Sequence, residues 1–153
     1  MKVGQKLVLK VTSSYCVELH KRLEKQNLTP KLYHYEIIGG WLMIFMEDLR
    51  DHSFATISGY LNEKQFKILE KAVEDIHNED WVHGDLREPN ILISANNQDI
   101  IKLIDFDWSG KVGKVHYPTY LNPKVDWPKG VVSGALIQKE HDMWWLEKLK
   151  IKN

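Results

Sequence analysis

The chain has one cysteine, no long apolar run and no excess of charge of either sign. Cys16 has no second cysteine with which to form an internal disulfide, which excludes the disulfide-stabilised class of small secreted domains. No stretch of about 18 apolar residues could span a bilayer, and the N-terminus lacks the apolar segment of a signal peptide. We therefore expect an intracellular protein, with the cytoplasm as the default compartment and no membrane partner.

The balance of charge also bears on the partners. Lysine plus arginine and aspartate plus glutamate each total 21 residues, so the formal net charge is zero. Binding to nucleic acid through its phosphates requires a basic surface, and the bulk charge therefore indicates no nucleic-acid partner.

Length and composition limit the number of domains. With 153 residues and 43% hydrophobic composition, the chain can bury one core. We predict a single domain over residues 1–153.

Hydrophobic periodicity predicts a mixture of helices and strands. Strands are expected at 6–11, 31–38, 41–46, 91–94 and 100–104. Helices are expected at 13–26, 62–78 and 137–151. Gly39-Gly40 suits the tight turn of a hairpin, and Ser13 or Ser14 could cap the first helix. Asn62 with Gln65 resembles a capping pair for the second helix.

Two further segments have no regular pattern. Residues 52–60 give no clear signal, and residues 109–134, which contain three prolines, are predicted to form a long irregular loop. Four lysines in this loop face only one acidic residue, Asp126. The loop is therefore either a solvated surface or a docking strip for an anionic partner.

The most informative feature is the segment His83-Gly84-Asp85-Leu86-Arg87-Glu88-Pro89-Asn90, followed later by Ile104-Asp105-Phe106-Asp107. Phosphoryl transfer needs Mg²⁺ to offset the charge of the phosphates, and Mg²⁺ prefers carboxylate and amide oxygens. Asp105 and Asn90 carry such oxygens. The predicted hairpin over 91–104 would bring these two side chains together at one end, where they could share a metal ion.

The pattern His83-x-Asp85-x-x-x-x-Asn90, with Asp105 twenty positions after Asp85, resembles the catalytic and metal-binding loops of the protein-kinase-like superfamily. The resemblance covers roughly residues 7–149, and the His-Gly-Asp form is more similar to atypical or small-molecule kinases than to standard protein kinases. It implies an α+β kinase-like fold. The expected parts are a reduced N-terminal lobe at 1–46, a hinge at 47–51 and a shortened, mainly helical C-terminal lobe at 52–153.

The resemblance implies roles for the residues of the two loops. Asp85 would accept the proton of the attacking hydroxyl, and Arg87 would steady the γ-phosphate of ATP. Asp105 would bind the Mg²⁺ ion that bridges the phosphates, and Asn90 would bind a second one. Arg87 could instead pair with Asp85 or Glu88 without contacting phosphate.

The nucleotide site is implied by matching positions in the same way. Lys10 would contact the α and β phosphates with Glu18 as its ion-pair partner, although the two could also be a solvated surface pair. His83 is expected to be a packed structural histidine. The adenine site and the support of the catalytic loop are assigned to Val8, Leu92, the gatekeeper Met46, the backbones of Glu47 and Leu49, and the buried Asp142.

The sequence also departs from the kinase pattern. Only nine residues precede Lys10, too few for the strands and glycine-rich loop that normally cover ATP, and Phe106-Asp107 replaces Phe-Gly. Asp107 adds a further carboxylate that could bind metal. Two functions remain open: an ATP- and Mg²⁺-dependent kinase with a protein Ser/Thr or small-molecule acceptor, or a pseudokinase that binds nucleotide or a protein partner.

The strands and glycine-rich loop that would cover ATP, here called the lid, could also come from another copy of the chain. A second copy of the chain that supplied this lid would make a homodimer. A third class of function, an unrelated Asp/His metal hydrolase, is disfavoured, because no second histidine stands at ligand spacing from His83.

Overall fold

The structure is a computed structural model that describes residues 6–57, 59–97 and 99–150. In chain order the elements are β1 (Leu7–Thr12), α1 (Val17–Lys25), β2 (Leu32–Ile38), β3 (Trp41–Glu47), β4 (Phe54–Thr56), α2 (Glu63–Asn78), β5 (Trp81–Val82), β6 (Ile91–Ser94), β7 (Ile101–Leu103), β8 (Gly110–Lys111) and α3 (Lys139–Lys148). Helices with antiparallel sheets make an α+β fold, as expected. The single domain and the hinge at 47–51 remain predictions, and the domain ends at 1–5 and 151–153 lie outside the described residues.

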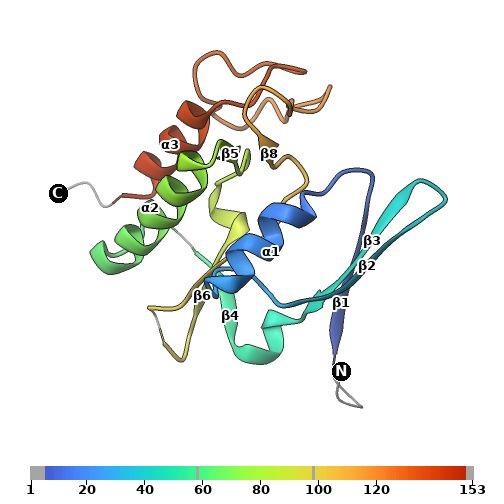
Figure 1. Cartoon of the computed structure of the whole chain (residues 1–153). Coiled ribbons are helices and arrows are strands. Elements are labelled where there is room, and N and C mark those ends of the chain that lie inside the picture. Colours follow the sequence, from blue (N-terminus) through green and yellow to red (C-terminus); the bar gives the residue numbers. More distant parts are fainter. Residues whose placement is uncertain (1–5, 58, 98, 151–153) are drawn as a thin grey trace.

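The first sheet has three antiparallel strands in the order β1-β3-β2. The Gly39-Gly40 turn joins β2 to β3 as predicted, and both glycines have positive φ angles, 57° and 84°. Lys10 in β1 lies opposite Ile44 in β3. Side chains alternate between the faces of a strand, so Val8 and Lys10 point to the same side of the sheet. Figure 1 shows α1 between this sheet and the two longer helices.

Helix α1 begins later than predicted, at Val17. The expectation that Ser13 or Ser14 caps it is wrong, because the N-cap position belongs to Cys16, which makes no side-chain cap bond. The Ser14 hydroxyl instead donates to the main-chain oxygen of Asp107 at 2.9 Å. The segment before α1 therefore links β1 to the Ile104-Asp105-Phe106-Asp107 motif.

A second sheet has the order β4-β6-β7. β6 and β7 form the predicted hairpin, with Ile91 opposite Leu103. β4 lies in the segment 52–60, which has no clear sequence pattern, and it pairs with β6. The two-residue strands β5 and β8 pair with each other and were not predicted.

Helix α2 carries the capping pair that the sequence indicates. The Gln65 N–H donates to Asn62 Oδ1, and the Asn62 N–H donates to Gln65 Oε1, both at 2.9 Å. The apolar side of α2 packs into the main core with buried residues of α1, the β6–β7 hairpin and α3. The fully buried large side chains of this core include Leu19, Leu23, Leu61, Leu69, Ile76, Leu86, Ile91, Ile101, Leu103 and Phe106.

Helix α3 is shorter than the predicted 137–151 and ends at Lys148. Between β8 and α3 the chain is irregular, as predicted, apart from an isolated bridge between His116 and Leu136. This loop nevertheless has a core of its own, in which Tyr117 and Ile137 are buried with Val82. In the parts of the chain that are described, none of the helices has the length and apolar character required to cross a bilayer.

Candidate active site

Asn90 and Asp105 lie at the same end of the β6–β7 hairpin. The Ile104 N–H donates to the main-chain oxygen of Asn90 at 3.0 Å, and Asp105 follows immediately. The predicted convergence of the two motifs is therefore confirmed. Asp105 has a φ angle of 67°, a left-handed conformation that is uncommon for a residue other than glycine. Such strain is often found where a side chain must be held for function.

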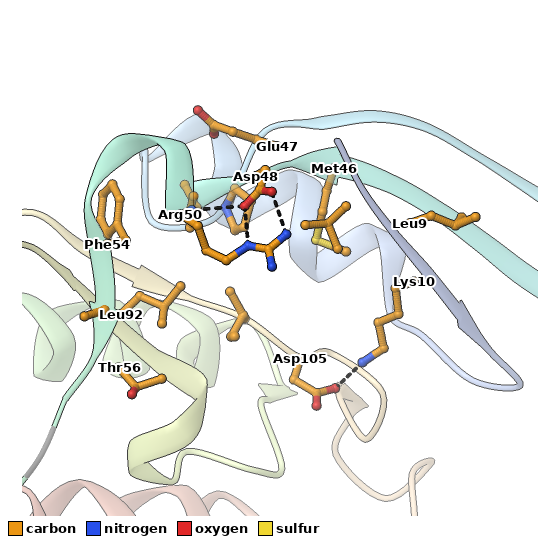
Figure 2. A pocket seen from close by; sticks show the side chains of 15 residues that line it. Leu9, Lys10, Met46, Glu47, Asp48, Arg50, Phe54, Thr56, Leu92 and Asp105 are labelled. Atoms are coloured by element: carbon orange, nitrogen blue, oxygen red, sulfur yellow. Dashed lines mark hydrogen bonds and ion pairs between the residues drawn. The ribbon is translucent and has the colours of Figure 1, made fainter. Parts of the chain in front are cut away.

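Lys10 reaches from β1 to the carboxylates that follow β7. Its Nζ lies 2.6 Å from Asp105 Oδ1 and 2.8 Å from Asp107 Oδ1, and Figure 2 shows the contact with Asp105. Burial of Lys10 acts to lower its pKa, but the hydrogen bonds to Asp105 and Asp107 outweigh burial and raise the pKa above its ordinary value. The ammonium group is therefore a fixed positive charge between two carboxylates.

Asp107 is held by a second partner besides Lys10. The Thr12 hydroxyl donates to Asp107 Oδ2 at 3.2 Å. Burial, helped by the neighbouring charge of Asp105, raises the pKa of Asp107 against the opposing effect of Lys10. One network therefore contains Lys10, Asp105, Asp107 and Thr12. No sequence motif pointed to Thr12.

The ion pair predicted between Lys10 and Glu18 is not found within the described part of the chain. Glu18 lies in the first turn of α1, with its side chain exposed. Lys10 is directed instead to Asp105. Asp105 and Asp107 therefore take the place of Glu18 as the partners of Lys10.

Asp85 is held by its two motif neighbours. Arg87 bonds both of its carboxylate oxygens: Arg87 Nε donates to Oδ1, and Arg87 Nη2 donates to Oδ2 at 2.8 Å. Asn90 Nδ2 donates to Asp85 Oδ2 at 2.8 Å and to its main-chain oxygen at 2.9 Å. The hydrogen bond to Asp85 raises the pKa of Arg87. Arg87 thus pairs with Asp85, one of the two partners considered from the sequence.

Asp142 of α3 supports this loop, as the resemblance implies. Its side chain is fully buried, and it accepts hydrogen bonds from the main-chain N–H groups of His83 at 2.7 Å and Gly84 at 2.9 Å. His77 Nε2 lies 3.1 Å from the same carboxylate. A carboxylate that accepts several such bonds fixes the backbone of the loop immediately before Asp85.

Gly84 and Ser109 explain why the loop and the segment after Asp105 pack closely. Gly84 has a φ angle of 85°, and a Cβ atom there would lie 2.9 Å from the main-chain oxygen of Trp108. The Ser109 hydroxyl donates to the main-chain oxygen of His83 at 2.6 Å. The glycine of the His-Gly-Asp sequence is therefore required by a close approach of two backbones.

His83 is a packed residue, as expected. It is fully buried, and burial lowers its pKa. Its ring lies 5.2 Å from that of Phe106, which in turn stacks on His20 at 5.2 Å. Phe106 thus joins the two motifs to α1 through ring contacts.

A cavity of about 660 Å³ lies between β1, the end of β3, β4 and the hairpin. Of the residues that the resemblance assigns to the nucleotide, all except Glu18 and Arg87 line it, together with Asp105 (Figure 2). These residues are Val8, Lys10, Met46, Glu47, Leu49 and Leu92. Sequence reasoning missed Leu9, Pro30, Asp48, Arg50, Phe54, Ala55, Thr56 and Ile104, which also line the cavity.

Asp48 and Arg50 form a fixed pair at the rim of the cavity. Asp48 caps the short 3-10 helix Leu49–His52 by accepting from the Arg50 N–H at 3.1 Å, and Arg50 Nη2 donates to Asp48 Oδ2 at 2.7 Å. This bonding to Arg50 lowers the pKa of Asp48 to about 2. An aspartate placed immediately before a short helix is the sequence signal that could have identified Asp48.

The backbone of Glu47, at the end of β3, is also engaged. The Glu47 N–H is bonded to the Lys31 main-chain oxygen at 2.9 Å.

The donor set near Asp105 fits a Mg²⁺ ion only in company with phosphate. No group of three or more His, Cys, Asp or Glu side chains suited to a metal ion occurs among residues 6–57, 59–97 and 99–150. Mg²⁺ is commonly held by one or two carboxylates and completed by water and substrate phosphates. Asp105 with the amide oxygen of Asn90 matches that arrangement. The Lys10 ammonium lies between Asp105 and Asp107, next to the carboxylate that would bind the ion.

A likeness to known proteins covers the part of the chain that holds these residues. The model of the protein kinase domain family matches residues 9–146, from the middle of β1 to α3. Comparison with curated proteins gives no match. The matched range contains Lys10, Asp85, Asn90, Asp105 and Asp142. The match covers most of the chain, and the chain therefore belongs to the protein kinase domain family.

Proposed function

We propose that the chain is an ATP- and Mg²⁺-dependent phosphotransferase that moves the γ-phosphoryl group to a hydroxyl acceptor. The observation that supports this most directly is the cavity of about 660 Å³, which has apolar walls and ends at Lys10 and Asp105. A nucleotide needs both features, because its base is flat and weakly polar whereas its phosphates are anionic.

In this proposal the base lies between Val8 and Leu92, beside Met46. The backbones of Glu47 and Leu49 supply its hydrogen bonds. Because the Glu47 N–H is bonded to Lys31, we expect the Glu47 carbonyl to be the group that accepts from the base. Lys10 would turn part of its hydrogen bonding from Asp105 to the α and β phosphates.

Asp105 and Asn90 would hold Mg²⁺. The ion, when bound, offsets the negative charge of the phosphates. Both hydrogen bonds of the Asn90 side chain to Asp85 use its Nδ2 donor. This geometry leaves the Asn90 amide oxygen as the natural metal ligand, and it links the metal site directly to Asp85.

Asp85 is proposed as the group that orients the acceptor hydroxyl and takes its proton. Asn90 fixes one carboxylate oxygen and Arg87 contacts both, so the plane of the carboxylate is set before a substrate arrives. Arg87 would then steady the γ-phosphate with the N–H donors that do not contact Asp85. The acceptor is either a protein Ser/Thr hydroxyl or a small molecule.

A second candidate function is a pseudokinase that binds nucleotide or a protein without turnover. The same ion pairs favour it, because Lys10 is neutralised by Asp105 and Asp107 while Asp85 is neutralised by Arg87.

The edge of the first sheet offers a place for a second copy of the chain. β1 pairs with β3 on one side and forms the edge of its three-stranded sheet. A strand from a second copy could add at that edge and cover the nucleotide, which is the proposed homodimer.

Consumption of ATP separates the two candidates. The chain would be incubated with ATP and Mg²⁺, with phosphate species followed by phosphorus NMR, beside Asp85→Asn as the control variant. The phosphotransferase proposal expects ATP loss that Asp85→Asn abolishes. Nucleotide binding with no ATP loss over mixed protein and small-molecule acceptors would favour the pseudokinase, and equal loss in both proteins would remove Asp85 from the mechanism.

A further inference from the structure

Arg87 has a second contact besides Asp85. Its guanidinium carbon lies 5.1 Å from the centre of the Trp127 ring, on the ring face. Trp127 belongs to the irregular loop between β8 and α3, forty residues further along the chain. A guanidinium group placed on an aromatic face is attracted by the electrons of the ring and loses rotational freedom.

Trp127 is itself fixed in the loop. Its indole N–H donates to the main-chain oxygen of Asn122 at 3.0 Å. Three other rings surround it: the ring centres of Trp145, Tyr117 and Trp108 lie 5.8, 6.0 and 6.1 Å away. These contacts make the Trp127 face a rigid support, although most of the loop has no regular secondary structure.

We propose that Trp127 is a positioning residue for Arg87 and, through Arg87, for Asp85. An arginine side chain has many rotamers, and a guanidinium bonded to one carboxylate can still swing with it. The Trp127 face removes this freedom by setting the plane of the group. Arg87 can then bond Asp85 on one edge while its remaining donors stay directed outward. The inference rests on the proposed function, because a phosphoryl group is what the outward donors of Arg87 would contact.

The position of Trp127 can be tested without nucleotide. The Nε–H signal of Arg87, assigned through Arg87→Lys, would be followed by nitrogen NMR in the full chain. In the wild type we expect slow exchange with water and an upfield shift caused by the Trp127 ring. Trp127→Leu should speed the exchange and remove the shift, whereas Trp127→Phe keeps an aromatic face and should preserve most of both.

Trp144→Leu is the matched control. Trp144 packs on Trp145 at 4.7 Å in the same group of rings, so its loss disturbs the aromatic core without removing the ring under Arg87. If Trp127 had only a structural role, both leucine variants would change the Arg87 signal alike. That outcome, or an unchanged Arg87 signal in Trp127→Leu, would overturn the proposal.

A rate measurement extends the test to function. Trp127→Leu should lower the rate of ATP consumption about 2- to 30-fold, the range that corresponds to the energy of one cation–π contact. Nucleotide affinity should change little, and Trp127→Phe should restore most of the rate. Equal rates for Trp127→Leu and Trp144→Leu would contradict the assignment. If the wild type consumes no ATP, the proposed phosphotransferase activity fails, and the Arg87 exchange rates still decide the role of Trp127.

Discussion

The Lys10 ammonium lies 2.6 Å from the Asp105 carboxylate, although the two residues are 95 positions apart in the sequence. The contact joins β1 to the segment after β7, and Asp107 shares the same ammonium at 2.8 Å. The cation therefore occupies a point on which two carboxylates converge. A metal ion bound to the same oxygens of Asp105 and Asp107 would compete with Lys10.

Replacement of Lys10 should expose this competition. Lys10→Met removes the ammonium and leaves Asp105 and Asp107 close together without a counter-charge, so the protein should bind Mn²⁺ about tenfold more tightly in the absence of nucleotide. Affinity for ATP should fall. Water-proton relaxation by Mn²⁺ measures the first effect, with the exposed Lys114→Met as control. An unchanged Mn²⁺ affinity would show that Lys10 does not occupy the cation position.

Loss of Asp142 should destabilise the whole domain. Asp142→Asn keeps the shape of the side chain but replaces an acceptor by a donor that faces the N–H groups of His83 and Gly84. We expect the free energy of unfolding in urea to fall by about 2–4 kcal/mol. Asp126→Asn, on an exposed loop residue, should cost about 0–1 kcal/mol. Similar small effects from both substitutions would mean that Asp142 does not anchor the catalytic loop.

The close approach at Gly84 can be separated from backbone strain. Gly84 and Gly113 both have positive φ angles, 85° and 74°, but a Cβ atom on Gly113 would meet nothing within 4 Å. Gly113→Ala should cost about 1–2 kcal/mol, the penalty of the left-handed conformation alone. Gly84→Ala should cost at least about 1 kcal/mol more, because of the clash with Trp108. Thermal or urea unfolding gives both values, and equal costs would rule out the steric explanation.

Stability should fall in mild acid, and His20 is one of the buried histidines responsible. This histidine is fully buried, its Nε2 lies 2.8 Å from the Pro30 main-chain oxygen, and its Nδ1 lies 2.7 Å from the Tyr15 hydroxyl. Burial lowers the pKa of His20 from 6.5 in spite of the bond to Pro30. The unfolded chain therefore binds more protons than the folded one below pH 6.5, and the free energy of unfolding decreases as pH falls.

The size of this effect is bounded for a single group. His20 can contribute a slope of at most about 1.4 kcal/mol per pH unit. His20→Gln should reduce the slope of the free energy of unfolding with pH below neutrality, while the exposed His116→Gln should leave it unchanged. Identical slopes in all three proteins would show that His20 is not responsible.

Much of the candidate site could be predicted because its residues belong to compact motifs. Asp85 and Asn90 stand at a fixed spacing, and the hairpin that follows must return the chain to Asp105. Any fold that forms this hairpin therefore brings the two motifs together. The apolar lining residues Val8 and Leu92 could be assigned because the resemblance to kinases supplies matching positions for them.

Some features of the fold depend on contacts that no local pattern records. The exposed orientation of Glu18 and the contacts of Lys10 with Asp105 and Asp107 are tertiary features that the sequence pattern does not contain. Strands of two or three residues, such as β4 and β8, owe their existence to pairing with distant segments and not to their own propensity. The contact of Trp127 with Arg87 likewise depends on how an irregular loop folds back.

Mg²⁺-dependent nucleotide binding at Asp105 is the central claim. The direct test is calorimetric titration of ATP, with and without Mg²⁺, into the wild type, Asp105→Asn and Asp85→Asn. We predict that the wild type binds ATP in the presence of Mg²⁺, that Asp105→Asn weakens this binding at least about tenfold, and that Asp85→Asn binds as the wild type does. Binding that ignores Mg²⁺, or equal losses in the two variants, would contradict the assignment of metal and base.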